Sequence, residues 1–203
     1  MTRLIVSGTD TGIGKTVLAA AIAAATGAAY WKPIQSGTLD DSDTANVRRL
    51  GIRTVHPEAY RLTEPLSPHR AAELDGVTID PEKLTPPDGT IVVEGSGGVL
   101  VPITRNLLFA DVFAGWGMPV VLAARTTLGT INHSLLSIEA LRARRVPIRG
   151  IAFVGEANAD NEATIAAIGG VRRLGRLPWI DRLDANTLAE AFAANFHPED
   201  FAA

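Results

Sequence analysis

The sequence lacks cysteine altogether, since none occurs among its 203 residues. Disulfides and thiolate catalysis are therefore excluded, and the absence is compatible with a reducing compartment. No apolar stretch approaches the roughly 20 residues that a membrane span requires, and residues 1–6 leave no room for a secretory signal. Neither sign of charge dominates, because 19 Lys+Arg stand against 22 Asp+Glu, a net charge of -3. We expect a cytoplasmic protein with no membrane and no nucleic-acid partner.

The glycine-rich segment at residues 8–16, GTDTGIGKT, is the most informative part of the chain. It lies between an apolar run at 4–6 and an alanine-rich segment at 17–25, so strand, glycine loop and helix follow one another as in a P-loop. In a P-loop the backbone N–H groups surround phosphate oxygens, a lysine (here Lys15) reaches the β- and γ-phosphates, and a hydroxyl (here Thr16) binds Mg²⁺. The loop is one residue longer than the usual pattern. A glycine-rich turn beside a surface lysine is the alternative.

Short apolar runs alternate with helical segments along the rest of the chain. We expect strands at 4–6, 28–31, 90–93, 120–124, 151–154 and 173–177, and helices at 17–25, 44–50, 107–114, 132–145, 162–168 and 185–196. A polar loop is expected at 35–43, and the proline-rich stretch 51–89 predicts loops with one helical turn at 70–74. This alternation implies an α/β fold with a mostly parallel sheet of about seven strands, helices on both faces, and a single domain over 1–203.

Polar residues that follow the expected strands are the candidates for ligand binding, because ligands of parallel sheets gather beyond the carboxyl ends of the strands. Glu94 directly follows a buried strand and precedes GSGG, which we expect to be a flexible loop rich in N–H donors. A buried carboxylate there needs a partner such as Mg²⁺, whereas a solvated loop acid needs none. Asp43 is compatible with a metal ligand and with a helix N-cap. Lys32 is compatible with anion binding and with a plain surface lysine.

Two later segments are less specific. Residues 128–133 precede a helix whose free N–H groups would bind a carboxylate or phosphate, with Asn132 as the N-cap. The alternative is that Asn132 only caps the helix and His133 only packs. Pro178 and Trp179 follow the last strand, where they either wall a nucleotide base or pack in the interior.

Taken in order, these segments resemble the dethiobiotin synthetases, ATP-dependent enzymes of biotin synthesis. The likeness covers most of the chain and rests on GTDT with GKT at 8–16, Lys32-Pro33, Ser36-Gly37, Asp43, Glu64-Pro65, Ser67-Pro68-His69, EGSGG at 94–98, Leu128-Gly129 with Ile131-Asn132-His133, and Gly175 with Pro178-Trp179. The resemblance implies a P-loop NTPase-type fold. It also implies that 7,8-diaminononanoate (7,8-diaminopelargonate), CO₂ or bicarbonate, and ATP form dethiobiotin through a carbamate and a carbamic-phosphoric mixed anhydride.

The resemblance further implies roles for matching residues. Lys15, Lys32 and Thr11 would be catalytic, Thr11 and Ser36 would hold the carbamate or diamine, and Thr16, Asp43 and Glu94 would hold Mg²⁺ directly or through water. The nucleotide would be bound by Gly12, Ile13, Gly14, Lys15, Thr16, Val17, Asp43, Glu94, Gly95, Ser96, Gly97, Leu177, Pro178 and Trp179. The family is homodimeric, and the substrate carboxylate would be held across the interface by the helix start at Gly129, Thr130 and Asn132.

Several positions depart from the family pattern. Gly12 stands where many members have an acidic residue, and Gly155-Glu156 replaces an Asn-Asp pair that reads adenine, which leaves the nucleotide open to ATP or another NTP. Thr126-Thr127 stands where the family has a lysine. Neither Tyr30 nor Tyr60 corresponds to the tyrosine with which the partner subunit holds the substrate tail.

Two other functions share the P-loop. One is a related P-loop synthetase that forms an amide, which would not share the residues at 32–36 and 129–133. The other is a P-loop ATPase switch of the partitioning or cell-division class. Such switches carry an extra lysine near the start of the loop, and residues 8–13 contain none.

Overall fold

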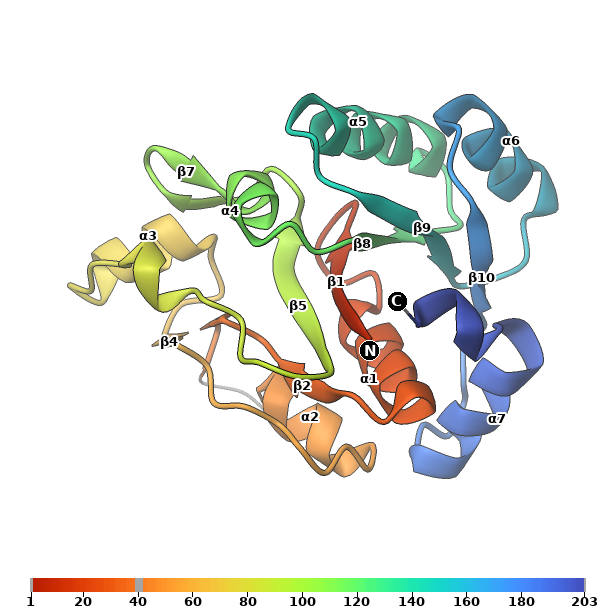
Figure 1. Cartoon of the computed structure of the whole chain (residues 1–203), viewed down its shortest axis with the longest axis horizontal. Coiled ribbons are helices and arrows are strands. Elements are labelled where there is room, and N and C mark those ends of the chain that lie inside the picture. Colours follow the sequence, from red (N-terminus) through yellow and green to blue (C-terminus); the bar gives the residue numbers. More distant parts are fainter. Residues whose placement is uncertain (1, 39–41, 203) are drawn as a thin grey trace.

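The computed structural model describes residues 2–38 and 42–202. A fully parallel sheet of six strands forms its centre, in the order β10-β9-β8-β1-β5-β2 (Figure 1). These strands are β1 (Arg3–Gly8), β2 (Ala29–Trp31), β5 (Ile91–Gly98), β8 (Val120–Arg125), β9 (Ile148–Val154) and β10 (Arg173–Leu177). The α/β class and the parallel sheet are confirmed. The sheet has six strands in the described residues where about seven were expected, and each of the six overlaps a predicted range.

Helices cover both faces of this sheet, as predicted. They are α1 (Lys15–Thr26), α2 (Asp43–Arg49), α3 (Pro68–Leu74), α4 (Phe109–Trp116), α5 (Thr130–Ala143), α6 (Ala159–Gly169) and α7 (Ala185–Asn195), with two 3₁₀ turns, η1 (Pro81–Lys83) and η2 (Pro198–Phe201). None of the helices in the described ranges combines the length and apolar character needed to cross a bilayer.

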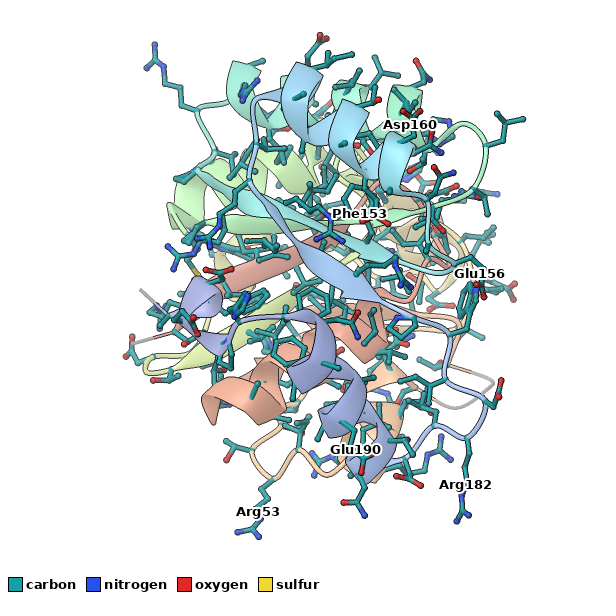
Figure 2. The ribbon with its side chains drawn as sticks, turned by 90° about the vertical axis from the view of Figure 1, so that its right-hand side faces the viewer. Arg53, Phe153, Glu156, Asp160, Arg182 and Glu190 are labelled. Atoms are coloured by element: carbon teal, nitrogen blue, oxygen red, sulfur yellow. The ribbon has the colours of Figure 1, made fainter. Side chains whose placement is uncertain are left out.

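Successive side chains of the strands point to opposite faces and enter two apolar cores. In β1, Leu4 and Val6 belong to the core that contains α1, α7 and η2. Ile5 belongs to the core that contains α4 and the buried faces of α5 and α6. Figure 2 shows Phe153 between the layers, whereas Arg182 extends outward. Burial on both faces explains why these strands appear in the sequence as continuous apolar runs.

Three parts of the structure differ from the expectation. Ile34–Ser36 forms a strand, β3, that pairs in parallel with β4 (Tyr60–Leu62), where loops were predicted. The glycines after Glu94 belong to β5, so this segment is not a flexible loop; Gly98 still pairs with Gly8 of β1. β6 (Pro102–Thr104) and β7 (Leu107–Leu108) form a short hairpin. The helix that was expected to begin at residue 107 therefore begins at Phe109. Each difference depends on pairing with a segment that the local pattern does not reveal.

Residues 39–41, part of the expected polar loop at 35–43, lie outside the described residues. The expected helical turn at 70–74 is confirmed and lies within α3.

The carboxyl ends of β1, β5 and β2 are neighbours at one edge of the sheet, and the loop between β1 and α1 lies there (Figure 1). The topology therefore brings residues 8–16, Glu94 and Lys32 to the same edge.

The end of α7 packs directly on the backbone of β10. Gly175 has φ 152°, and a Cβ at this position would overlap the carbonyl oxygen of Asn195 and lie 2.5 Å from Cδ1 of Phe196. Phe196 itself stacks on Phe192, with ring centroids 4.8 Å apart. A side chain at residue 175 would therefore separate α7 from the sheet.

We predict that Gly175→Ala lowers the free energy of unfolding by about 2 kcal/mol, because the added methyl group has no space and the backbone angle is unfavourable for alanine. Gly115→Ala is the matched control. Gly115 lies within α4 with nothing within 4 Å of a Cβ, so this change is expected to stabilise the protein by about 0.5–1 kcal/mol. Urea denaturation measures both, and equal stability of the two variants would contradict the close packing of α7 on β10.

Candidate active site

The loop at residues 8–16 connects β1 to α1, and its lysine side chain bonds back to the backbone of the loop. Gly14 adopts a left-handed conformation at φ 88° and ends the loop, so that Lys15 becomes the first residue of α1. Its Nζ donates a hydrogen bond to the carbonyl oxygen of Asp10 at 2.6 Å. Burial is the main reason why the pKa of Lys15 is lowered to about 8. The loop therefore holds a largely buried ammonium beside the N-terminus of α1.

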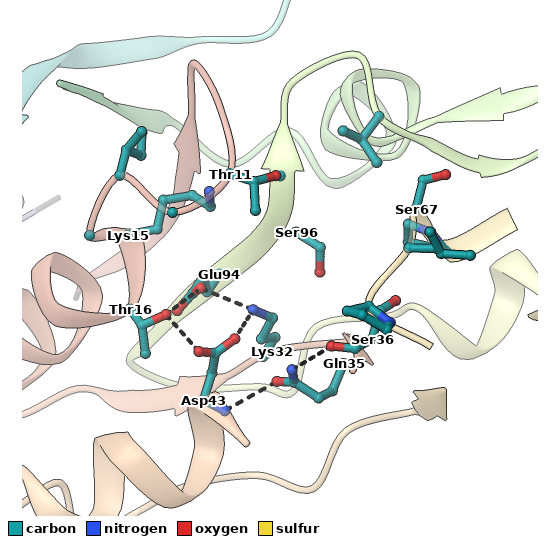
Figure 3. Close-up of a pocket in the computed structure, with 18 residues that line it drawn as sticks. Thr11, Lys15, Thr16, Lys32, Gln35, Ser36, Asp43, Ser67, Glu94 and Ser96 are labelled. Atoms are coloured by element: carbon teal, nitrogen blue, oxygen red, sulfur yellow. Dashed lines mark hydrogen bonds and ion pairs between the residues drawn. The ribbon is translucent and has the colours of Figure 1, made fainter. Parts of the chain in front are cut away.

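Three oxygen-bearing side chains from three elements meet next to this loop. Thr16 Oγ1, from α1, lies 3.0 Å from Asp43 Oδ1 of α2 and 2.9 Å from Glu94 Oε1 of β5 (Figure 3). Ser42, not Asp43, caps α2, because its Oγ accepts a hydrogen bond from the backbone N–H of Ala45 at 3.2 Å. The carboxylate of Asp43 is therefore free to face Thr16.

Lys32 lies between the two carboxylates. Its Nζ forms an ion pair with Asp43 Oδ2 and a second one with Glu94 Oε1 at 3.1 Å. Lys32 is 6% exposed and Glu94 is 1% exposed, so the alternatives of a surface lysine and a solvated loop acid are wrong. Burial, the largest effect, lowers the pKa of Lys32, but the charges of Glu94 and Asp43 together outweigh it and the pKa is raised. The ammonium therefore stays charged at neutral pH.

The donor set formed by Thr16, Asp43 and Glu94 is of the kind that Mg²⁺ prefers, since it consists only of oxygen. The hydroxyl of Thr16 has a single hydrogen to donate, yet two carboxylates lie within hydrogen-bond distance of its oxygen. One of these oxygen pairs is therefore suited to a cation between its members. Among the described residues, no group of three or more His, Cys, Asp or Glu could hold a metal ion. The site thus fits a hard cation that keeps most of its water ligands, rather than zinc.

A cavity of about 360 Å³ opens in front of these groups. The predicted residues that line it are Thr11, Gly12, Ile13, Gly14, Lys15, Thr16, Lys32, Ser36, Asp43, Glu94, Ser96 and Gly97. Ser36 Oγ is buried and has no hydrogen-bond partner among the described residues, whereas Ser96 Oγ donates to the carbonyl oxygen of Ile34 at 2.7 Å. The hydroxyl of Ser36 is therefore uncommitted within the described part of the chain, and that of Ser96 is not.

The other predicted residues lie outside this cavity. Gly95 is buried beneath the strand surface and Val17 is half-buried in α1. Gly129, with φ 90°, precedes α5, so the expectation that Asn132 is the N-cap is wrong; Asn132 lies in the first turn and is exposed. Thr130 is buried at the start of α5, and its Oγ1 donates to the carbonyl oxygen of Arg125.

The residues expected near the nucleotide base lie at and just after the end of β10. Leu177 is buried, Pro178 is half-buried, and Trp179 is 63% exposed. Trp179 lies beside Gly155, where a Cβ would be 3.7 Å from its indole Nε1. The exposed indole can thus contact a ligand that lies over Gly155.

The structure explains why residue 155 is a glycine. Its φ is 127°, and a Cβ there would lie 2.7 Å from Thr126 Oγ1. Thr126, which also departs from the family pattern, therefore leaves no space for a side chain at residue 155. The carbonyl oxygen of Gly155 accepts a hydrogen bond from Arg176 Nη1 at 2.8 Å. Polar contacts to a base at this residue could come only from its backbone.

Three residues of the site have no signal in the sequence. The Tyr30 hydroxyl donates to Glu94 Oε2 at 2.8 Å, and Gln35 Oε1 accepts from the backbone N–H of Asp43 at 3.2 Å. Arg125, at the end of β8, forms an ion pair with Asp10 of the loop. Burial, followed by the charge of Glu94, raises the pKa of Tyr30 well above its usual range, so the phenol stays protonated. Tyr30 lies in an apolar run, and nothing in that pattern distinguishes it from a core residue.

We predict that Lys32→Met lowers the free energy of unfolding by about 3 kcal/mol or more, because Glu94 would remain buried without its counter-charge. The chain has three lysines, and Lys83, which is exposed, is the matched control. Lys83→Met is expected to change stability by less than about 0.5 kcal/mol. Adding Glu94→Gln to Lys32→Met should recover part of the loss. Thermal unfolding of the four proteins tests this, and a Lys32→Met protein as stable as Lys83→Met would exclude a stabilising ion pair.

Comparison with known proteins identifies close relatives. Residues 2–187 match the family model described as an AAA domain. The chain is 59% identical to the ATP-dependent dethiobiotin synthetase BioD of Sphingopyxis alaskensis, with 99% of this chain and 100% of the relative covered. It is 60% identical to the protein of the same name from Novosphingobium aromaticivorans, with 100% of both chains covered. A third, from Rhizorhabdus wittichii, is also 60% identical over 100% of both chains.

Solved structures extend the likeness at the level of the fold. The cell division ATPase MinD of Pyrococcus furiosus matches with a TM-score of 0.54 at 14% identity, covering 96% of this chain and 99% of that one. The MinC:MinD cell division complex of Aquifex aeolicus matches with a TM-score of 0.55 at 12% identity, covering 93% and 85%. At such identities the likeness shows a shared fold alone.

Proposed function

The chain belongs to the family of ATP-dependent dethiobiotin synthetases, and on this premise we propose how its residues carry out that reaction. The reaction is the ATP-dependent ring closure of 7,8-diaminononanoate with CO₂ to dethiobiotin, which makes the protein a cyclo-ligase. Thr16, Asp43 and Glu94 would hold Mg²⁺ directly or through water. The observation that carries the proposal is that two buried lysines, Lys15 and Lys32, face one cavity beside a cluster of oxygen donors.

The chemistry consists of three bond-forming steps. One amine of the substrate attacks CO₂ and loses a proton, which gives a carbamate. A carbamate oxygen then attacks the γ-phosphorus of ATP, and ADP leaves. The second amine attacks the carbonyl carbon of the resulting mixed anhydride and loses a proton, phosphate leaves, and the ring closes. No covalent link to the protein is formed, so the protein contributes positioning and stabilisation of charge.

Lys32 acts as a fixed positive charge in these steps. Because Asp43 and Glu94 raise its pKa, it stays an ammonium and cannot serve as a base. Its charge, together with that of Lys15, stabilises the negative charge on the carbamate and on the transferring phosphoryl group. Thr11 and Ser36 hydrogen-bond the carbamate or diamine, and the Ser36 hydroxyl has no partner among residues 2–38 and 42–202. When bound, Mg²⁺ would supply positive charge against the phosphate oxygens.

The nucleotide lies along the loop at 8–16, with its base toward Trp179. Gly155 and Glu156 replace the Asn-Asp pair, so backbone groups and the indole face contact the base, and NTPs other than ATP remain candidates. The same resemblance supports three further proposals about the protein. The chain is one domain over 1–203, and it forms a homodimer in the cytoplasm. The substrate carboxylate is bound at Gly129, Thr130 and Asn132 of the partner subunit. The exposure of Gly129 and Asn132 is compatible with that contact.

The first test is ring closure by the purified protein. Dethiobiotin formation is followed from diaminononanoate, bicarbonate and Mg²⁺, with ATP, CTP and GTP in parallel. Product is expected with ATP, and product with CTP or GTP as well would indicate that the base is not read by a specific side chain. The absence of product with every nucleotide would overturn the proposal.

We predict that Lys32→Gln abolishes turnover and leaves nucleotide affinity within a few fold, because Lys32 contacts the reacting groups and not the nucleotide in its ground state. Lys83→Gln is the control and should behave like the wild type. Single-turnover kinetics and equilibrium binding of ADP measure the two quantities. Retained turnover together with a strong loss of nucleotide binding would refute this role of Lys32.

A further inference from the structure

Tyr30 places a hydroxyl on the far side of the Glu94 carboxylate from the cavity. Its ring is completely buried in the core that contains α1, and its hydroxyl donates to Glu94 Oε2 at 2.8 Å. The other oxygen, Oε1, lies 2.9 Å from Thr16 Oγ1 and 3.1 Å from Lys32 Nζ. The two oxygens of Glu94 therefore have different and separate partners.

We propose that Tyr30 is a positioning residue of the metal site, whose hydroxyl fixes the rotation of the Glu94 carboxylate so that Oε1 faces Thr16, Lys32 and the bound Mg²⁺. This inference rests on the proposed Mg²⁺ site. Tyr30 does not contact the cavity, and it acts only through Glu94.

The geometry supports this role because the backbone of Tyr30 is fixed on both of its sides. Its backbone N–H donates to the carbonyl oxygen of Thr54 at 2.9 Å, and its carbonyl oxygen accepts from His56 at 2.9 Å. Strand pairing places Tyr30 beside Val92, two residues before Glu94. The phenol ring is also completely buried in the core, so it cannot follow a rotating carboxylate, and rotation of Glu94 would break the hydrogen bond.

Loss of this hydrogen bond would not remove a ligand of the metal. It would release Oε2 and allow the carboxylate to turn about its terminal torsion, which is soft in glutamate. Groups that orient metal-binding carboxylates in this way typically contribute roughly tenfold to hundredfold to metal affinity. The inference therefore predicts an effect on Mg²⁺ that packing of the ring alone would not produce.

The chain provides a matched pair of variants, because it contains two tyrosines. The hydroxyl of Tyr60 also makes one hydrogen bond, as acceptor from the backbone N–H of Asp80 at 2.8 Å, and Tyr60 does not line the cavity. Tyr30→Phe and Tyr60→Phe each remove one hydroxyl and keep the ring. Any general cost of losing a tyrosine hydroxyl should appear in both variants.

The measurement is the affinity for Mg²⁺ in the presence of saturating ADP, by titration calorimetry, with no turnover involved. Tyr30→Phe is expected to weaken Mg²⁺ binding roughly tenfold or more, whereas Tyr60→Phe should leave it unchanged. ADP affinity without Mg²⁺ should be the same in all three proteins. Equal Mg²⁺ affinity of Tyr30→Phe and the wild type would overturn the positioning role and leave the proposed metal site intact. Absence of Mg²⁺ binding by the wild type would overturn both.

A second measurement needs no stable Tyr30→Phe protein. Wild type labelled with 3-fluorotyrosine gives one ¹⁹F resonance for each tyrosine, and Tyr60→Phe assigns them. Addition of Mg²⁺ to the ADP complex is expected to shift the Tyr30 resonance and not that of Tyr60. An unchanged Tyr30 resonance at saturating Mg²⁺ would contradict the inference.

Discussion

The ammonium of Lys32, buried between Asp43 and Glu94, is the interaction on which the rest of the site depends. Burying the charge of Lys32 or Glu94 alone would be strongly unfavourable, but the two compensate each other and the half-buried Asp43 adds a second counter-charge. They come from the end of β2, from α2 and from β5, so the cluster exists only when these elements are packed together. The same contacts that make burial tolerable keep Lys32 charged and hold it against the cavity. The ion pairs of Lys32 therefore serve both the stability of the fold and the proposed chemistry of the site.

The parallel sheet determines which residues can join this cluster. Because β1 lies between β8 and β5, and β5 lies next to β2, the segments that follow these strands meet at one edge. The P-loop occupies that edge, as its strand-loop-helix pattern requires. Around it, the hydroxyl of Thr16 joins the loop to the two carboxylates, and Gln35 joins Asp43 to the strand that carries Ser36.

The sequence predicts the parts of the fold whose cause is local. The glycine loop, the six buried strands and the helices between them follow from residue types that are close together in the chain. The strands β3 and β4 were missed because each is stabilised by the other, across a proline-rich stretch with no periodic pattern. The glycines after Glu94 predict a flexible loop, because glycine disfavours strands in general. Here Gly98 pairs with Gly8 of β1, and a Cβ on Gly98 would lie 3.4 Å from the carbonyl oxygen of Thr9, a close approach of backbones that suits glycine.

By itself the sequence determined the P-loop, the class of fold, and the residue types available for binding phosphate and a cation. Only the tertiary structure decided which of these residues are buried together. Lys32 and Glu94 are 62 residues apart and Tyr30 and Glu94 are 64 apart, so neither contact leaves a periodic trace in the chain. Likewise, Gly155 is required because Thr126, on a neighbouring strand end, fills the space of a side chain. Burial and charge compensation depend on which residues are neighbours in space, and the order of the strands in the folded sheet determines those neighbours.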